Sequence, residues 1–125
     1  MGWNLDSGLP IYSQLIEQLQ CRIVSGTYAP GSRLASVRDL ANEASVNPNT
    51  MQRAMTELER LGLIYTERTN GRYITENKEL IAMTKKKIAL EKIGSFIDQM
   101  RELGYKKEEM LELMEEASRE VKGNE

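Results

Sequence analysis

The stretch VNPNTMQRAMTELERLG, residues 46 to 62, gathers uncharged hydrogen-bonding side chains at the start of a predicted helix. No acid occurs between residues 44 and 56, and Arg53 is the only charged residue there. Amides such as those of Asn49 and Gln52 can pair with base edges, and a guanidinium suits phosphate or guanine. Because phosphates line both walls of a DNA groove, a carboxylate in this stretch would be repelled. The pattern therefore favours a surface that contacts nucleic acid.

Other kinds of chemistry have little support in the composition. The chain of 125 residues has no histidine, which removes the commonest general base, and its single cysteine, Cys21, excludes a disulfide framework and most zinc sites. No pair of carboxylates is singled out for catalysis, so we expect no enzyme, no metal and no cofactor. No apolar run could span a bilayer and the N-terminal stretch lacks a signal pattern, so we expect a reducing cytoplasm.

The overall charge does not indicate a nucleic-acid partner, because the net charge is −2 and the isoelectric point is about 5.4. The cations are nevertheless divided along the chain. Seven arginines and no lysine precede residue 77, whereas eight lysines and two arginines follow it. Arginine suits phosphate and guanine, and lysine solvates exposed helices. The partition fits a binding unit followed by a helical tail, although chance alone could also produce it.

Apolar residues at helical spacing predict a first helix that begins at Pro10 and ends before Gly26. Its expected buried face consists of Tyr12, Leu15, Ile16, Leu19 and Ile23. A short second helix follows, with Ser36 as its N-cap. The apolar residues of this second helix are Val37, Leu40, Ala41 and Ala44.

A third helix has Asn47 as its expected N-cap and Pro48 at its first position, where a missing N–H costs nothing. Its expected core residues are Met51, Ala54, Met55, Leu58 and Leu61. The short join to the second helix is typical of a helix-turn-helix. The pair Asn70-Gly71 then predicts a β-hairpin. Three helices followed by a hairpin is the order of a winged helix-turn-helix.

From residue 77 the helical spacing continues for more than twenty residues, breaks at Gly104 and resumes, which predicts a helical hairpin. The expected fold is thus mainly α with a small β-hairpin: a winged helix-turn-helix over residues 1–76 and a helical domain over 77–125. So small a pair of helices cannot bury its apolar faces unaided, so a partner is implied. The expected interface residues are Ile88, Ile93, Phe96, Ile97, Met100, Leu103, Met110, Leu111 and Met114.

The segment YAPGSRLASVRDLANEASVNPNTMQRAMTELERLGLIYTERTNGRYIT resembles the DNA-binding domain of the GntR family of bacterial transcription regulators. A Pro-Gly turn with a basic residue, a Ser-x-Arg helix start, an Asn-Thr pair on the third helix and a glycine-containing wing occur in order over about residues 9 to 76. Two departures are Ala35, where the family usually has proline, and Pro48, where many members have arginine. The VNPNT form and the short helical tail resemble the YtrA-like subfamily.

This resemblance implies a homodimeric repressor that binds an inverted-repeat operator in the bacterial cytoplasm, typically of an ABC-transporter operon. Together with the amino-terminal residues of the third helix, it predicts a set of DNA contacts. The set is Arg33, Ser36, Arg38, Asn47, Asn49, Thr50, Gln52, Arg53, Gly71 and Arg72. A helical hairpin has little room for a small-molecule cavity, so an unknown effector, if one exists, would bind between protomers.

A second interpretation stays open at this point. The winged helix could be a protein-interaction module without specific DNA binding. The acidic isoelectric point favours this alternative, and the acid-free start of the third helix counts against it.

Overall fold

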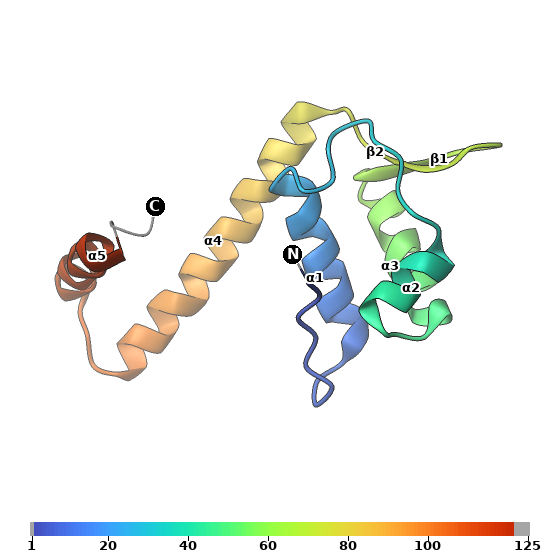
Figure 1. Cartoon of the computed structure of the whole chain (residues 1–125). Helices are drawn as coiled ribbons and strands as arrows, with labels where there is room; N and C mark the ends of the chain where they lie inside the picture. Colours follow the sequence, from blue (N-terminus) through green and yellow to red (C-terminus); the bar gives the residue numbers. More distant parts are fainter. Residues whose placement is uncertain (1, 122–125) are drawn as a thin grey trace. The chain divides into compact units, whose positions relative to one another are not determined.

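A computed structural model describes residues 2 to 121, which form five helices and one β-hairpin (Figure 1). The mainly helical fold with a small hairpin, predicted from the sequence, is confirmed. The chain forms two compact units, Met1–Lys86 and Lys87–Glu125. The units divide within the fourth helix, whereas the sequence-based division was placed ahead of it. Among the described helices, none has the length and apolar character needed to cross a membrane.

The first unit contains three helices, the hairpin and the beginning of a fourth helix. These elements are α1 Ile11–Val24, α2 Val37–Ala44, α3 Pro48–Arg60, β1 Ile64–Glu67, β2 Gly71–Ile74 and α4 Lys78–Glu102. Helix α3 packs against both α1 and α2, and its carboxyl end leads into β1 (Figure 1). The arrangement is that of a winged helix-turn-helix, with α3 as its second, recognition helix and the hairpin as its wing.

Local rules explain why the helices begin where they do. The Ser36 hydroxyl accepts a hydrogen bond from the Asp39 N–H at 3.1 Å, and Asn47 Oδ1 accepts one from the Asn49 N–H at 2.7 Å. Each side chain satisfies a backbone donor that the first turn of a helix leaves unpaired. Pro48 occupies the first position of α3, as predicted. The N-caps of α2 and α3 are therefore confirmed.

The turn between α2 and α3 is closed by its own backbone. Ser45 adopts a left-handed conformation with φ of 57°, and the Val46 N–H donates to the Ala41 carbonyl at 2.9 Å. This reversal satisfies the last carbonyl groups of α2 and turns the chain directly into α3. It fixes α2 beside α3 with two residues between Ala44 and the Asn47 cap.

The wing is an antiparallel hairpin extended by a third short segment. Ile64 pairs with Ile74 at its base, and Arg33 forms a bridge with Tyr73 on the other side of β2. The Leu34 N–H donates to the Arg72 carbonyl at 2.9 Å, which ties the segment before α2 to the wing. The hairpin predicted at Asn70-Gly71 is confirmed.

One apolar core holds the first unit together. It combines residues from the three helices, the wing and the segment before α2, as the sequence pattern predicted for the helices. Its buried members include Leu15, Leu19, Ile23, Leu40, Met51, Met55, Leu58, Ile64 and Ile74. Leu80 and Ile81 of α4 pack against the same core, which explains why the start of α4 belongs to this unit.

The segment before α1 is held along that helix by two glutamines. Gln14 Oε1 accepts from the Asp6 N–H at 2.7 Å and its Nε2 donates back to the Asp6 carbonyl at 2.9 Å; Gln18 makes the same exchange with Asn4. This places the Trp3 ring over the guanidinium of Arg22, at 3.9 Å from the ring centroid.

Arg22 is 8% exposed although it is charged. Its guanidinium lies over Trp3 and also 5.7 Å from the Tyr28 ring centroid. Burial raises the pKa of Tyr28, and the neighbouring positive charge of Arg22 opposes that shift. Two aromatic rings thus cover a cation that would be costly to bury without such partners.

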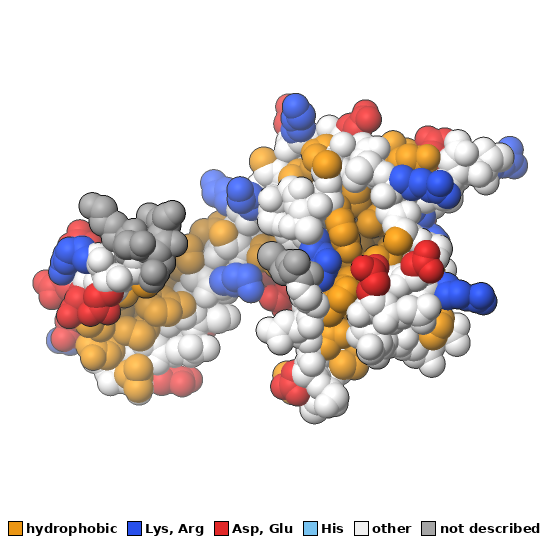
Figure 2. All heavy atoms as spheres, viewed as in Figure 1, with side chains coloured by type: hydrophobic (Ala, Val, Ile, Leu, Met, Phe, Trp, Pro, Cys, Tyr) orange, Lys and Arg blue, Asp and Glu red, His pale blue; other side chains and the backbone are white. Residues whose placement is uncertain are grey.

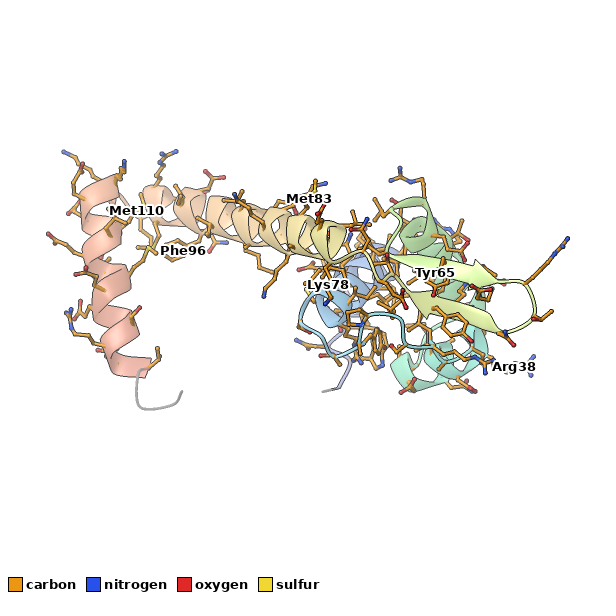
Figure 3. The ribbon with its side chains drawn as sticks, turned by 90° about the horizontal axis from the view of Figure 1, so that it is seen from above. Arg38, Tyr65, Lys78, Met83, Phe96 and Met110 are labelled. Atoms are coloured by element: carbon orange, nitrogen blue, oxygen red, sulfur yellow. The ribbon has the colours of Figure 1, made fainter. Side chains whose placement is uncertain are left out.

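The second unit consists of the remainder of α4 and of α5, Lys107–Val121, which follow each other through a break at Gly104 with φ of 96°. Met110, which the sequence assigned to a dimer interface, is already buried within its own chain at 5% exposure. Figure 3 shows Phe96 near Met110, on the side of α4 toward α5. The other predicted interface residues are half-buried (Ile88, Ile97, Met100) or exposed (Ile93, Phe96, Leu103, Leu111, Met114).

We expect Trp3→Ala to lower the stability of the first unit by about 1–3 kcal/mol, because Arg22 loses an aromatic partner and Trp3 loses its buried area. Thermal unfolding followed by circular dichroism, which reports the loss of the helices, would measure this. Leu9→Ala, at an exposed position of the same segment, is the control and should change the midpoint little. Equal shifts for the two variants would contradict the proposed role of the stack.

Candidate nucleic-acid interface

Helix α3 presents a polar face directly opposite its apolar one. Met51, Met55 and Leu58 are buried, whereas Asn49 and Gln52 are exposed. Successive residues of a helix are rotated by about 100°, so burying the first set turns the second set outward. The predicted reading face is therefore open, as a helix that enters a DNA groove requires.

Six of the ten predicted DNA contacts surround one open hollow between α2, α3 and the wing. They are Arg33, Ser36, Arg38, Gln52, Gly71 and Arg72. The hollow measures about 770 Å³ and is also lined by Asp39. Asp39 is the one acid of this lining, and it lies in the first turn of α2, where the positive end of the helix dipole favours it. The fold thus brings together residues that lie as far apart in the chain as Arg33 and Arg72.

Basic side chains stand out over the hairpin and beside α2 (Figure 2). Arg38 points away from the core of the first unit (Figure 3). Arg33 is exposed and lies against the wing, with Nε and Nη2 each 3.4 Å from where a side-chain carbon on Gly71 would stand. Gly71 has φ of 95°, a conformation that favours glycine. Both its backbone conformation and the adjacent Arg33 side chain therefore favour a residue without a side chain here.

Arg72 lies in β2 and is engaged with α3. Its Nε donates to Glu59 Oε1 at 2.7 Å, and the Thr66 hydroxyl donates to the same oxygen at 3.0 Å. The side chains of Arg72 and Glu59 are both about one-third exposed or less. This ion pair fastens the wing to the recognition helix.

The second acid of α3, Glu57, is also paired. Arg60 Nε and Nη2 donate to its two carboxylate oxygens at 2.7 and 2.6 Å, a bidentate pair on the helix surface. This pairing with Arg60 holds the pKa of Glu57 below its usual range. Both acids in the second half of α3 are therefore neutralised by arginines, and the start of the helix carries no negative side chain.

Asn47 and Thr50 lie apart from the larger hollow. Together with Leu5, Ser7 and Ile11 they border a smaller one, of about 450 Å³, between the N-terminal segment and the α2–α3 turn. The side-chain oxygen of Asn47 is used to cap α3. A DNA contact by these two residues stays a prediction.

Thr56 and Tyr12, which were not predicted to contact DNA, each contact a residue that was. The Gln52 amide donates to the Thr56 hydroxyl at 3.4 Å, and that hydroxyl donates to the Gln52 carbonyl at 3.0 Å. The guanidinium of Arg53 lies over the ring of Tyr12, 4.4 Å from its centroid. The sequence pattern placed Tyr12 on the buried face of α1, and the structure leaves it half-buried. Helical spacing of Gln52 and Thr56 could have indicated the first pair, but no local pattern indicates the second.

The sequence model of the family described as "Bacterial regulatory proteins, gntR family" matches residues 11–74, which span α1, the helix-turn-helix and the wing. The chain belongs to the GntR family. YtrA, an HTH-type transcriptional repressor of Bacillus subtilis (strain 168), is 39% identical over 118 residues, which are 94% of this chain and 91% of YtrA. YhcF, an HTH-type transcriptional regulator of the same organism, is 45% identical over 109 residues, which are 87% of this chain and 90% of YhcF.

Solved structures of GntR regulators have the same fold. A GntR family transcriptional regulator from Listeria monocytogenes superposes with a TM-score of 0.83 at 41% identity, over 90% of this chain and 98% of that one. The DNA-binding domain of AraR, solved in complex with its operator ORE1, gives a TM-score of 0.50 at 25% identity, over 60% of this chain and 94% of that one.

The GntR protein is thus a DNA-binding transcription regulator, from a family of regulators and not of enzymes. The comparisons do not favour a winged helix that serves only protein contacts. The polar face of α3 and the hollow beside it form the candidate interface with DNA.

We expect Glu59→Gln to tighten DNA binding at low salt by roughly two- to fivefold per half-site, a factor that matches a surface ion-pair energy of about 0.5–1 kcal/mol. The amide keeps a hydrogen-bond acceptor for Arg72 and Thr66 but removes a charge that competes with phosphate. Salt-dependent binding should also become steeper. Glu112→Gln on α5 makes the same charge change as a control and should leave binding as it is. Weaker binding by Glu59→Gln would contradict this account.

Proposed function

We propose that this GntR protein is a sequence-specific repressor that acts as a homodimer on an inverted-repeat operator in the bacterial cytoplasm. The observation that carries the proposal is the acid-free, exposed face of α3 beside a hollow lined by arginines. The repressor role is supported by the similarity to YtrA. A transport operon of the ABC type as the regulated target, and an effector bound between protomers, stay predictions from the resemblance.

In this proposal α3 lies in the major groove, with its amino-terminal residues toward the base edges. Asn49 and Gln52 read bases, because an amide can donate and accept at the same adenine. Thr56 orients the Gln52 side chain, because its hydroxyl accepts a hydrogen bond from the Gln52 amide and is itself held by the Gln52 backbone carbonyl. Arg33 and Arg38, on the opposite wall of the hollow, contact backbone phosphates.

Homodimer formation is argued from the second unit. Among residues 87 to 121, Met110 is the only side chain that the structure buries. Large apolar side chains on both helices of this unit remain exposed to water, from 38% at Phe96 to 57% at Leu90, and Leu103, just after α4, is 73% exposed. Hydrophobic side chains gather on α4 and α5 in Figure 2. An apolar surface of this kind marks a protein contact. A second copy of the chain supplies the same surface, which a two-fold axis makes self-complementary.

A dimer also suits the task of reading DNA. One winged helix touches few base pairs, and two related by a two-fold axis read both halves of an inverted repeat, about one helical turn apart. Linking two such domains raises the affinity for the whole site well above that of either half.

We expect Gln52→Ala and Arg38→Ala to weaken DNA binding in different ways. Loss of the Gln52 amide should relax base preference at one position of each half-site, by about 1–3 kcal/mol of discrimination. Loss of Arg38 should weaken binding to all sequences and lower the salt slope by about one per protomer. Binding titrations of an operator duplex and of its single-base variants, at several salt concentrations, separate these effects. If the unaltered protein binds all duplexes alike, operator-specific regulation is excluded.

We expect Phe96→Glu to give a monomer, because a charge would be buried against the partner's apolar surface. Its affinity for the full inverted repeat should fall about 10²–10⁴-fold, toward that for a single half-site. Sedimentation measures the mass, and circular dichroism checks that the helices remain. Ser95→Glu, at an exposed neighbouring position, introduces the same charge as the control. A Phe96→Glu variant that stays dimeric would contradict the proposed interface.

A further inference from the structure

Arg53 differs from Arg60 of α3 and Arg72 of the wing in how it is held. Arg60 and Arg72 each donate to a glutamate of α3. Among the described residues, no carboxylate forms an ion pair with Arg53; its guanidinium carbon lies over the Tyr12 ring of α1 instead, 4.4 Å from the ring centroid. Its full positive charge therefore remains available to a ligand, and a ring from another helix restricts where the group can go.

The position of Arg53 on the helix separates it from Gln52. Gln52 and Arg53 are rotated by about 100° from each other around α3, with Asn49 between them. Gln52 turns toward the hollow beside α2 and the wing, and Arg53 turns toward α1. When α3 lies in a groove, residues on its flanks face the walls, which are phosphates, and residues on its central face point to the bases.

Stacking on Tyr12 suits Arg53 to phosphate binding. A guanidinium that lies on a ring face keeps its N–H groups in the plane of the group, directed away from the ring. Such a fork can donate two parallel hydrogen bonds to a phosphate. A preorganised head group also loses less side-chain entropy when it binds.

We propose that Tyr12 and Arg53 form a phosphate anchor on the α1 flank of the recognition helix, with Tyr12 as a residue that positions Arg53. The proposal rests on the proposed placement of α3 in the major groove. It makes Arg53 a contact to the DNA backbone, where the sequence left phosphate and guanine both open as its partner. Together with Arg33 and Arg38 on the opposite flank, the anchor lets one domain grip both walls of the groove.

The test uses the full-length protein and two duplexes of equal length: an operator duplex selected by the protein from a random-sequence pool, and an unrelated duplex. Binding is measured over a range of salt concentrations for Arg53→Ala, Tyr12→Leu and Tyr12→Phe, and for Arg53→Ala combined with Tyr12→Leu. Tyr12→Phe is the matched control, because it keeps the ring face and removes only the hydroxyl.

Arg53→Ala should weaken binding to both duplexes by the same factor and lower the salt slope by about 0.9 for each protomer, the loss of one phosphate contact. Tyr12→Phe should bind as the unaltered protein does. Tyr12→Leu should weaken binding to both duplexes by less than Arg53→Ala, and should add no further loss when Arg53 is already alanine. Arg53→Lys keeps the positive charge but removes the planar guanidinium, so it should resemble Tyr12→Leu. If Tyr12→Leu lowers the unfolding midpoint, Arg53→Lys takes its place in the test.

Three results would overturn the anchor. In the first, Arg53→Ala changes base preference and leaves the salt slope as it was, as expected of a base contact. In the second, the two substitutions weaken binding additively, as expected of independent residues. In the third, Tyr12→Phe loses as much affinity as Tyr12→Leu. If the unaltered protein binds both duplexes equally, operator-specific regulation fails, but the salt slope on either duplex still tests the anchor.

Discussion

Burial of one face of α3 against α1 and α2 determines which side chains this GntR protein presents to DNA. Met51, Met55 and Leu58 are held in the core at zero exposure. A helix is rigid about its axis, so fixing these residues fixes the directions of all the others. Asn49 can face outward only because the apolar residues recur at helical spacing behind it. The same core also contains residues of the wing and of α4, so the reading face and its flanks share one support.

Around this support, charge is arranged so that negative side chains are neutralised beside the reading face. Glu57 and Glu59 lie on α3 beyond its reading end, and each is bound by an arginine. The Glu59–Arg72 pair has a second role, since it joins the wing to the helix it flanks. The arginines of the first unit thus differ in their surroundings. Arg60 and Arg72 neutralise acids, Arg22 is covered by aromatic rings, and Arg38 points away from the core. The number of arginines before residue 77 does not by itself reveal these different surroundings.

Features determined by neighbouring residues were predictable from the sequence. The Ser36 and Asn47 caps, Pro48 at the first position of α3 and the Asn70-Gly71 hairpin follow from local backbone chemistry, and each is present. Pairs that join distant segments were not predictable. Tyr12 was assigned to the buried face of α1 because an aromatic ring fits the apolar pattern, and nothing local indicates that Arg53 of another helix covers it. Likewise, Arg72 was expected to contact DNA, and its ion pair with Glu59 depends on how the wing folds back on α3.

The low net charge of the chain is consistent with a regulator whose specificity depends on geometry. Non-specific DNA affinity grows with the number of phosphates that a protein neutralises, and a chain with a net charge of −2 gains little from its overall field. Its attraction to DNA must come from the few arginines that the fold directs to one surface. A single domain with so few contacts would bind weakly, so the exposed apolar residues of α4 and α5 become part of the same argument. The proposed dimer would double the number of contacts only where two half-sites have the right spacing, and would restrict tight binding to such sites.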